Sequence, residues 1–137
     1  MAGNVVVDAG FLVALLGGRD LNHRWAVAQT THRYPPPWKT CEAVLSEAFH
    51  LLGPRGVPVL GALVRRRAVG IAFDFSDDSE AVLKLMEKYA DVPASLADAC
   101  LVRMTEVLAN PIVLTTDTDF RVYRRHGRQI VPTVLPS

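Results

Sequence analysis

The chain has 137 residues and a mass of 15.0 kDa, which is enough for one domain with a single core and too little for a second domain of ordinary size. Half of the residues are apolar and 21% are charged, so the composition excludes an intrinsically disordered chain. The formal net charge is +1, which excludes nucleic-acid binding through overall basicity and leaves local basic clusters as the means.

The amino-terminal half alternates extended and helical patterns. Val5–Val7 is a β-branched run that predicts a buried strand of a parallel sheet, and Asp8 follows it directly. Glycine and proline clusters separate the segments that come next. We expect helices at Phe11–Leu16, from Asp20 to about Arg33, from Glu42 to Leu52 and from Val59 to about Arg67, with Trp38–Thr40 extended between the second and the third.

The carboxy-terminal half continues the alternation. The residues Ser95 to Asp98 have the form of a capping box, which predicts the start of a helix. We further expect a strand at Ile71–Phe73 extending to Phe75, a helix capped by Asp77, a strand at Ile112–Leu114 and a last strand near Gln129–Val134. This order predicts a single α/β domain over residues 1–137, with a central parallel sheet between two helical layers.

Cys41 and Cys100 lie inside apolar segments, without the number of cysteines for a disulfide framework or the spacing of a zinc site. We expect both to be buried and reduced. The sequence has no pattern of a signal peptide, and the apolar run from Val5 to Leu16 is interrupted by Asp8 and too short to cross a bilayer. We therefore expect a soluble, cytoplasmic protein with no membrane partner.

Four carboxylates occupy positions that a parallel sheet brings together. Asp8 follows the first strand and Asp117 follows the third, and ligands of open parallel sheets bind beyond the carboxyl ends of strands. Glu42 and Asp98 lie in the first turns of helices, each about 100° from the centre of its apolar stripe. Both helix-borne acids have a plainer interpretation, Glu42 as a favourable charge at a helix start and Asp98 as part of a capping box.

Acids gathered in this way repel one another unless a cation neutralises them. Oxygen ligands with few imidazoles nearby favour Mg²⁺ or Mn²⁺ over zinc. Such a site can activate water, polarise a phosphate and stabilise the leaving oxygen, so the pattern predicts phosphoryl chemistry of the kind found in many nucleases.

Four segments in order resemble the motifs of the PIN-domain family. They are Val5–Asp8 with Phe11–Leu16, then Glu42–Glu47, then Ser95–Ala99 and finally Leu114–Phe120. The resemblance covers nearly the whole chain, and the small size is similar to that of the VapC-type ribonuclease toxins of that family. It implies a hydrolase, an endoribonuclease dependent on Mg²⁺ or Mn²⁺, with an RNA substrate, a cognate antitoxin protein as partner and a homodimeric state.

By the same resemblance, Asp8, Glu42 and Asp98 match the core acids of the family, with Asp8 and Asp98 as direct metal ligands. The fourth acid is Asp117 or Asp119, and we prefer Asp117 because it lies closer to the strand end. The other member of the pair is then expected to cap the turn that follows. Thr115 or Thr116 is expected to orient a water molecule.

A basic run follows the acidic loop, and its position favours contacts with RNA phosphates through Arg121, Arg124 and Arg125. The alternative is a solvated helix end at which the positive arginines interact favourably with the helix dipole. The alternative function for the whole chain is a catalytically inactive PIN-like domain that binds a protein partner. A phosphatase-like use of Asp117 and Asp119 is disfavoured because few residues follow them.

Overall fold

The computed structural model describes residues 3–137 and has five parallel strands in one sheet, ordered β3-β2-β1-β4-β7. The chain winds outward from β1 first through β2 to β3 and then through β4 to β7, so the strand order reverses between β1 and β4. The strands are β1 (Asn4–Val7), β2 (Trp38–Thr40), β3 (Val69–Ile71), β4 (Pro111–Leu114) and β7 (Thr133–Val134).

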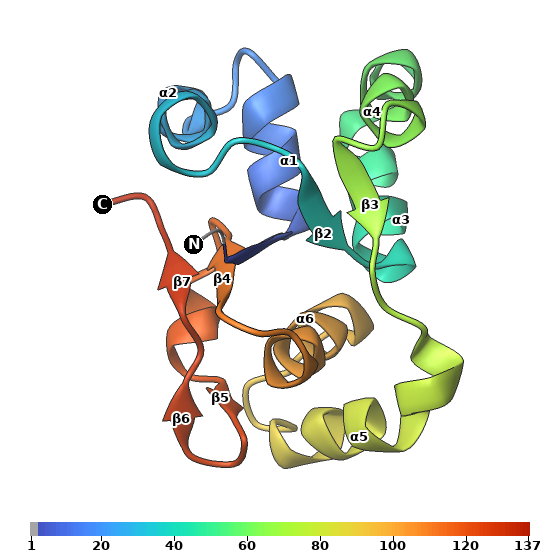
Figure 1. The fold of residues 1–137 in the computed structure, drawn as a ribbon, viewed down its shortest axis with the longest axis vertical. Coiled ribbons are helices and arrows are strands. Elements are labelled where there is room, and N and C mark those ends of the chain that lie inside the picture. Colours follow the sequence, from blue (N-terminus) through green and yellow to red (C-terminus); the bar gives the residue numbers. More distant parts are fainter. Residues whose placement is uncertain (1–2) are drawn as a thin grey trace.

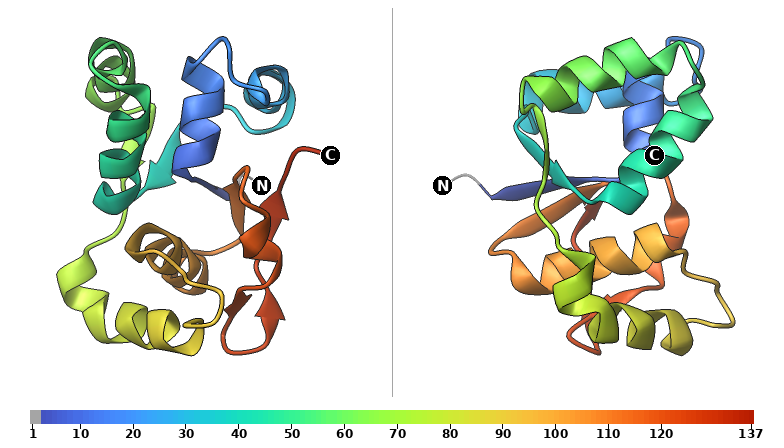
Figure 2. Two further views of the ribbon diagram at one scale, coloured as in Figure 1. Left: turned by 180° about the vertical axis from the view of Figure 1, so that it is seen from behind. Right: turned by 90° about the vertical axis from the view of Figure 1, so that its right-hand side faces the viewer.

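Helices cover both faces of this sheet, as Figures 1 and 2 show. One layer holds α1 (Ala9–Leu16), α2 (His23–Ala28), the π-helical turn η1 (Gln29–Arg33), α3 (Glu42–Leu52) and α4 (Gly56–Arg65). The other layer holds α5 (Phe75–Lys88) and α6 (Leu96–Val107). The expected three-layer α/β fold with a central parallel sheet is confirmed. Within residues 3–137, no helix combines the length and the apolar character needed to span a membrane.

The core lies where these layers meet the central strands. Val6, Val7 and Leu114 are fully buried, as the continuous apolar runs of β1 and β4 require in a sheet covered on both faces. On the α1 side, the Phe11 ring packs edge-to-face against two tryptophans, with centroids 5.9 Å from Trp25 and 5.3 Å from Trp38. These contacts fix α1, and with it the loop that follows β1, against the sheet.

Two of the expected boundaries around residues 71–78 are wrong. The strand ends at Ile71, and Phe75 is the first residue of α5. The helix is capped by Asp74, whose carboxylate accepts a 3.0 Å hydrogen bond from the Ser76 amide, and the expected cap Asp77 lies inside the first turn. The Asp74 carboxylate already accepts from a free amide of the first turn, so the cap lies three residues before the predicted one.

The predicted strand near Gln129–Val134 is divided in two. Its first part, β6 (Gln129–Ile130), pairs antiparallel with β5 (Arg124–Arg125) in a separate hairpin, and only β7 joins the main sheet. Pro132 lies between the two parts and has no amide hydrogen to donate. The expected helix from Asp20 to Arg33 is also shorter, because it begins at His23 and its last turn is π-helical.

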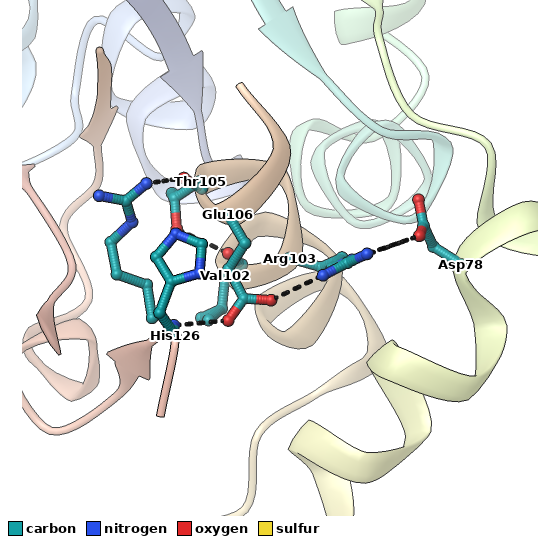
Figure 3. Close-up of polar contacts among 7 residues, drawn as sticks. Asp78, Val102, Arg103, Thr105, Glu106 and His126 are labelled. Atoms are coloured by element: carbon teal, nitrogen blue, oxygen red, sulfur yellow. Dashed lines mark hydrogen bonds and ion pairs between the residues drawn. The ribbon is translucent and has the colours of Figure 1, made fainter. Parts of the chain in front are cut away.

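A chain of ionic contacts ties the hairpin to α5 and α6 (Figure 3). The Arg103 guanidinium lies 3.1 Å from the Asp78 carboxylate and 3.2 Å from the Glu106 carboxylate. The second oxygen of Glu106 accepts a 2.7 Å hydrogen bond from the His126 amide, in the hairpin turn where His126 has φ of 51°. Arg103 therefore links α6 to α5, and Glu106 holds Arg103 and links α6 to the turn of the hairpin.

Replacing Glu106 by alanine leaves Arg103 and the His126 amide each without one partner. We expect Glu106→Ala to lower the free energy of unfolding by about 1–2 kcal/mol, measured by urea denaturation. The exposed Glu87 of α5 provides a control with the same change of charge. Equal losses for Glu106→Ala and Glu87→Ala would contradict this role.

Candidate metal centre

Asp8 lies at the carboxyl end of the central strand β1 and begins α1. One carboxylate oxygen, Oδ1, accepts a 2.7 Å hydrogen bond from the Ala9 amide, which makes Asp8 the cap of α1. The other oxygen, Oδ2, accepts a 2.7 Å hydrogen bond from the Thr115 hydroxyl. The residue is only 5% exposed, so the structure holds a carboxylate in the interior, in a fixed orientation.

Burial raises the pKa of Asp8 to about 7. The negative charges of Asp98 and Glu47 raise this pKa further, whereas the hydrogen bonds from Thr115 and Ala9 lower it. No basic side chain is among the groups that shift the pKa of Asp8 in the described part of the chain. The ionised form of Asp8 therefore lacks a compensating positive charge.

Thr115 connects the ends of β1 and β4. Its hydroxyl donates to Asp8 and accepts a 3.0 Å hydrogen bond from the Asp117 amide. Thr115 thereby orients the Asp8 carboxylate, and the expectation that Thr115 or Thr116 orients a water molecule stays a prediction. Thr116 packs on Gly10, where a Cβ atom would lie 2.1 Å from the Thr116 hydroxyl oxygen, so any larger residue at position 10 would force Thr116 to shift.

Asp98 lies in the first turn of α6 and completes the predicted capping box with Ser95. The Ser95 hydroxyl accepts from the Asp98 amide at 3.0 Å, and Asp98 Oδ2 accepts from the Ser95 amide at 3.1 Å. The same oxygen lies 3.3 Å from the Tyr123 hydroxyl, which donates to it. Burial and the charge of Asp117 raise the pKa of Asp98. The capping residue is therefore also part of an acidic cluster, which consists of Asp8, Glu47, Asp98 and Asp117.

The helix α3 carries two glutamates, and the structure brings the second one to the cluster. Burial raises the pKa of Glu47, and the charges of Asp98 and Asp117 raise it further. Both glutamates are exposed overall, and Glu42 lines a surface hollow with Ile71, Ala72, Phe73 and Asp74. The two glutamates are five positions apart in the sequence, which places them about 140° apart around the helix. The charges of Asp98 and Asp117 thus act on Glu47, which the sequence analysis did not single out, and the role of Glu42 stays a prediction.

The loop after β4 supplies the fourth carboxylate. Asp117 caps the 3₁₀ turn η2 (Thr118–Arg121), because its Oδ1 accepts a 2.9 Å hydrogen bond from the Asp119 amide. The charge of Asp117 also raises the pKa of Asp98 and of Glu47. Asp119 is exposed. We expected one of the two aspartates to cap this turn, and Asp117 does so. Asp117 is also the member of the pair whose charge acts on the other acids.

The arginines expected to contact RNA have different surroundings. Arg124 donates to the carbonyl oxygens of Arg121, Val122 and Tyr123, at 2.7, 3.2 and 3.0 Å. Arg125 donates to the Thr105 carbonyl of α6 (Figure 3). These two side chains hold the hairpin in place, whereas Arg121 is exposed beside the acidic loop.

The donor set fits a hard divalent cation. Its members are carboxylates, and Asp8, Glu47 and Asp98 have raised pKa values to which the charges of neighbouring acids contribute. Within residues 3–137, no group of three or more His, Cys, Asp or Glu side chains is close enough to hold an ion as it stands. Repulsion between unneutralised carboxylates opposes their closer approach, and a cation would reverse it.

Comparison with known protein families identifies the fold. The sequence pattern of the PIN domain family matches residues 5–125 of this chain, a range that includes all four carboxylates of the cluster. The chain belongs to the PIN domain family. PIN domains generally have a metal-dependent nuclease fold and typically bind divalent metals, which agrees with the acids at the strand ends. No curated protein and no solved structure gives a significant match to this chain.

The raised pKa of Asp8 makes stability depend on pH. The folded protein retains a proton on Asp8 between about pH 4 and pH 7, whereas an unfolded chain releases it near pH 4. In EDTA-containing buffer, the free energy of unfolding should therefore fall as the pH rises through this range. We expect Asp8→Asn to flatten the fall by roughly 1 kcal/mol per pH unit, measured by urea denaturation. The same flattening in Asp91→Asn, at an exposed position, would show that burial is not the cause.

Proposed function

We propose that this PIN domain is an endoribonuclease that depends on Mg²⁺ or Mn²⁺ and hydrolyses phosphodiester bonds of RNA. The observation that carries the proposal is the buried carboxylate of Asp8 at the point where the strand order reverses, with Asp98 and Glu47 charged beside it. A buried acid without a basic partner costs stability, and a divalent cation is the partner that its surroundings fit.

In this proposal, Asp8 and Asp98 hold the cation directly, and Glu47 and Asp117 complete its surroundings. When bound, the ion supplies positive charge that offsets the carboxylates and stabilises the negative charge developing on the phosphate. Asp8 gives up the proton on its carboxyl group before it can act as a ligand. Thr115 keeps the Asp8 carboxylate in one orientation, and the Ser95 amide and the Tyr123 hydroxyl do the same for Asp98.

RNA also needs contacts outside the acidic cluster. Arg121 follows the acidic loop and is exposed, so we assign it the contact with a flanking phosphate. Arg124 and Arg125 support this position through their hydrogen bonds to backbone carbonyls. The choice of RNA follows the resemblance of the four segments to VapC-type toxins, and we propose a cytoplasmic location for the protein.

The nuclease proposal is tested with purified RNA, with Mg²⁺ or Mn²⁺ and with EDTA. We expect cleavage only with the metal, and a loss of at least roughly 10–100-fold in Asp8→Asn and in Glu47→Gln. Glu42→Gln is the matched comparison on the same helix and should retain activity. Loss in Glu42→Gln with activity kept in Glu47→Gln would reverse the assignment. Absence of metal-dependent cleavage would favour the alternative of a catalytically inactive interaction domain.

We further propose that the protein is the homodimeric toxin of a toxin–antitoxin pair. The support is a group of exposed apolar side chains between residues 20 and 67, all from the helical layer that carries α1 to α4. They include Leu21, Leu51, Val57 and Val59. Apolar side chains left in water at several places on one layer are suited to contact with a protein partner.

The partner surface is tested by co-expression with the cognate antitoxin that this proposal requires. We expect Leu51→Ser to reduce the amount of that protein recovered with the purified chain, because it removes apolar contact area. Leu83→Ser, on α5 in the opposite layer, is the matched control. Equal recovery with both variants would exclude Leu51 from the interface.

A further inference from the structure

Two thiols from distant parts of the sequence meet next to the acidic cluster. Cys41 is the cap residue of α3, and Cys100 lies in α6. Both residues are 2% exposed, and each thiol is the neighbour that most strongly shifts the pKa of the other, which places the two side chains together. The expectation that the two cysteines are buried and free is confirmed. The nuclease proposal makes no use of this pair.

The thiol pair has an approach from the surface. Cys41 and Cys100 line the same cavity of about 360 Å³ between α3, α6 and the start of α5. Phe75 and Leu96 also line it, and both are partly exposed, so the cavity reaches the outside of the molecule. A cavity of this size admits a small molecule, which gives a dissolved reagent access to sulfur atoms that are otherwise covered.

The local backbone favours reaction at Cys41. Cys41 is the residue immediately before α3, so its side chain lies at the amino terminus of that helix. Amide hydrogens at a helix start stabilise negative charge on sulfur, which is the form that attacks a disulfide. Cys100 lies beside it and supplies the second sulfur.

We propose that Cys41 and Cys100 form a reversible intramolecular disulfide in exchange with a low-molecular-weight disulfide such as oxidised glutathione. The Cys41 sulfur, after losing its proton, attacks one sulfur of the reagent, whose S–S bond breaks and releases one thiol. The Cys100 sulfur then attacks Cys41, breaks the mixed disulfide and releases the second thiol. Two electrons and two protons pass from the cysteines to the reagent, which is reduced to two thiols.

The bond would join the helices that carry Glu47 and Asp98. Cys41 begins α3 and Cys100 lies two residues after Asp98, so oxidation fixes the start of α3 to α6. The proposal rests on the thiols and the cavity, and it holds whether or not the acidic cluster cleaves RNA.

The test is intact-mass analysis of the folded wild-type protein after incubation with oxidised glutathione, followed by peptide mapping without reduction. We expect a loss of two hydrogen atoms, one cross-linked peptide pair containing Cys41 and Cys100, and full reversal by dithiothreitol. Cys100→Ser should instead stop at the mixed disulfide and gain one glutathione on Cys41. Circular dichroism checks that this variant is folded, and the wild-type result does not depend on it.

Three outcomes would overturn the proposal. They are two free thiols in the wild type after oxidation, two separate glutathione adducts, or a disulfide between two copies of the chain. A denatured sample oxidised in parallel shows that the reagent is active, so unreacted thiols in the folded protein would report on the site itself.

Discussion

The burial of the Asp8 carboxylate governs the chemistry of this fold. The continuous valine run of β1 needs a covered sheet, and the strand delivers the next side chain into the interior at the point where the strand order reverses. Two hydrogen bonds satisfy the oxygens of Asp8 but do not cancel its charge, because its charged neighbours Asp98 and Glu47 are also acids. The site therefore requires a proton or a cation.

Groups that stabilise the fold also position the acids. Asp8 caps α1, Asp98 completes a capping box and Asp117 caps η2, so each aspartate is oriented by amides of its own helix or turn. Thr115 joins two of these elements with one hydroxyl. The interpretation of Asp98 as a capping residue and its interpretation as a site residue are thus compatible, since a cap satisfies part of the carboxylate and leaves its charge in place.

Local patterns sufficed to predict the strand that ends just before Asp8, the capping box and the layered sheet. They did not suffice to choose between Glu42 and Glu47, which lie about 100° and about 120° from the centre of the apolar stripe, on opposite sides. Only the packing of α3 against α1 and α6, which buries Val44 and Ala48, decides which glutamate faces the cluster. The hairpin of β5 and β6 was missed because its two-residue strands depend on contacts with α6 from Glu106 and Arg125.

The protonation of Asp8 with and without a divalent cation tests this account most directly. The measurement is a pH titration of the Asp8 side-chain carboxyl carbon by ¹³C NMR, in EDTA and then in saturating Mg²⁺. The account predicts a midpoint near pH 7 in EDTA and a midpoint at least about one pH unit lower with Mg²⁺, because the ion favours the ionised form. An unchanged midpoint with Mg²⁺, or an ordinary value near 4 in EDTA, would contradict it.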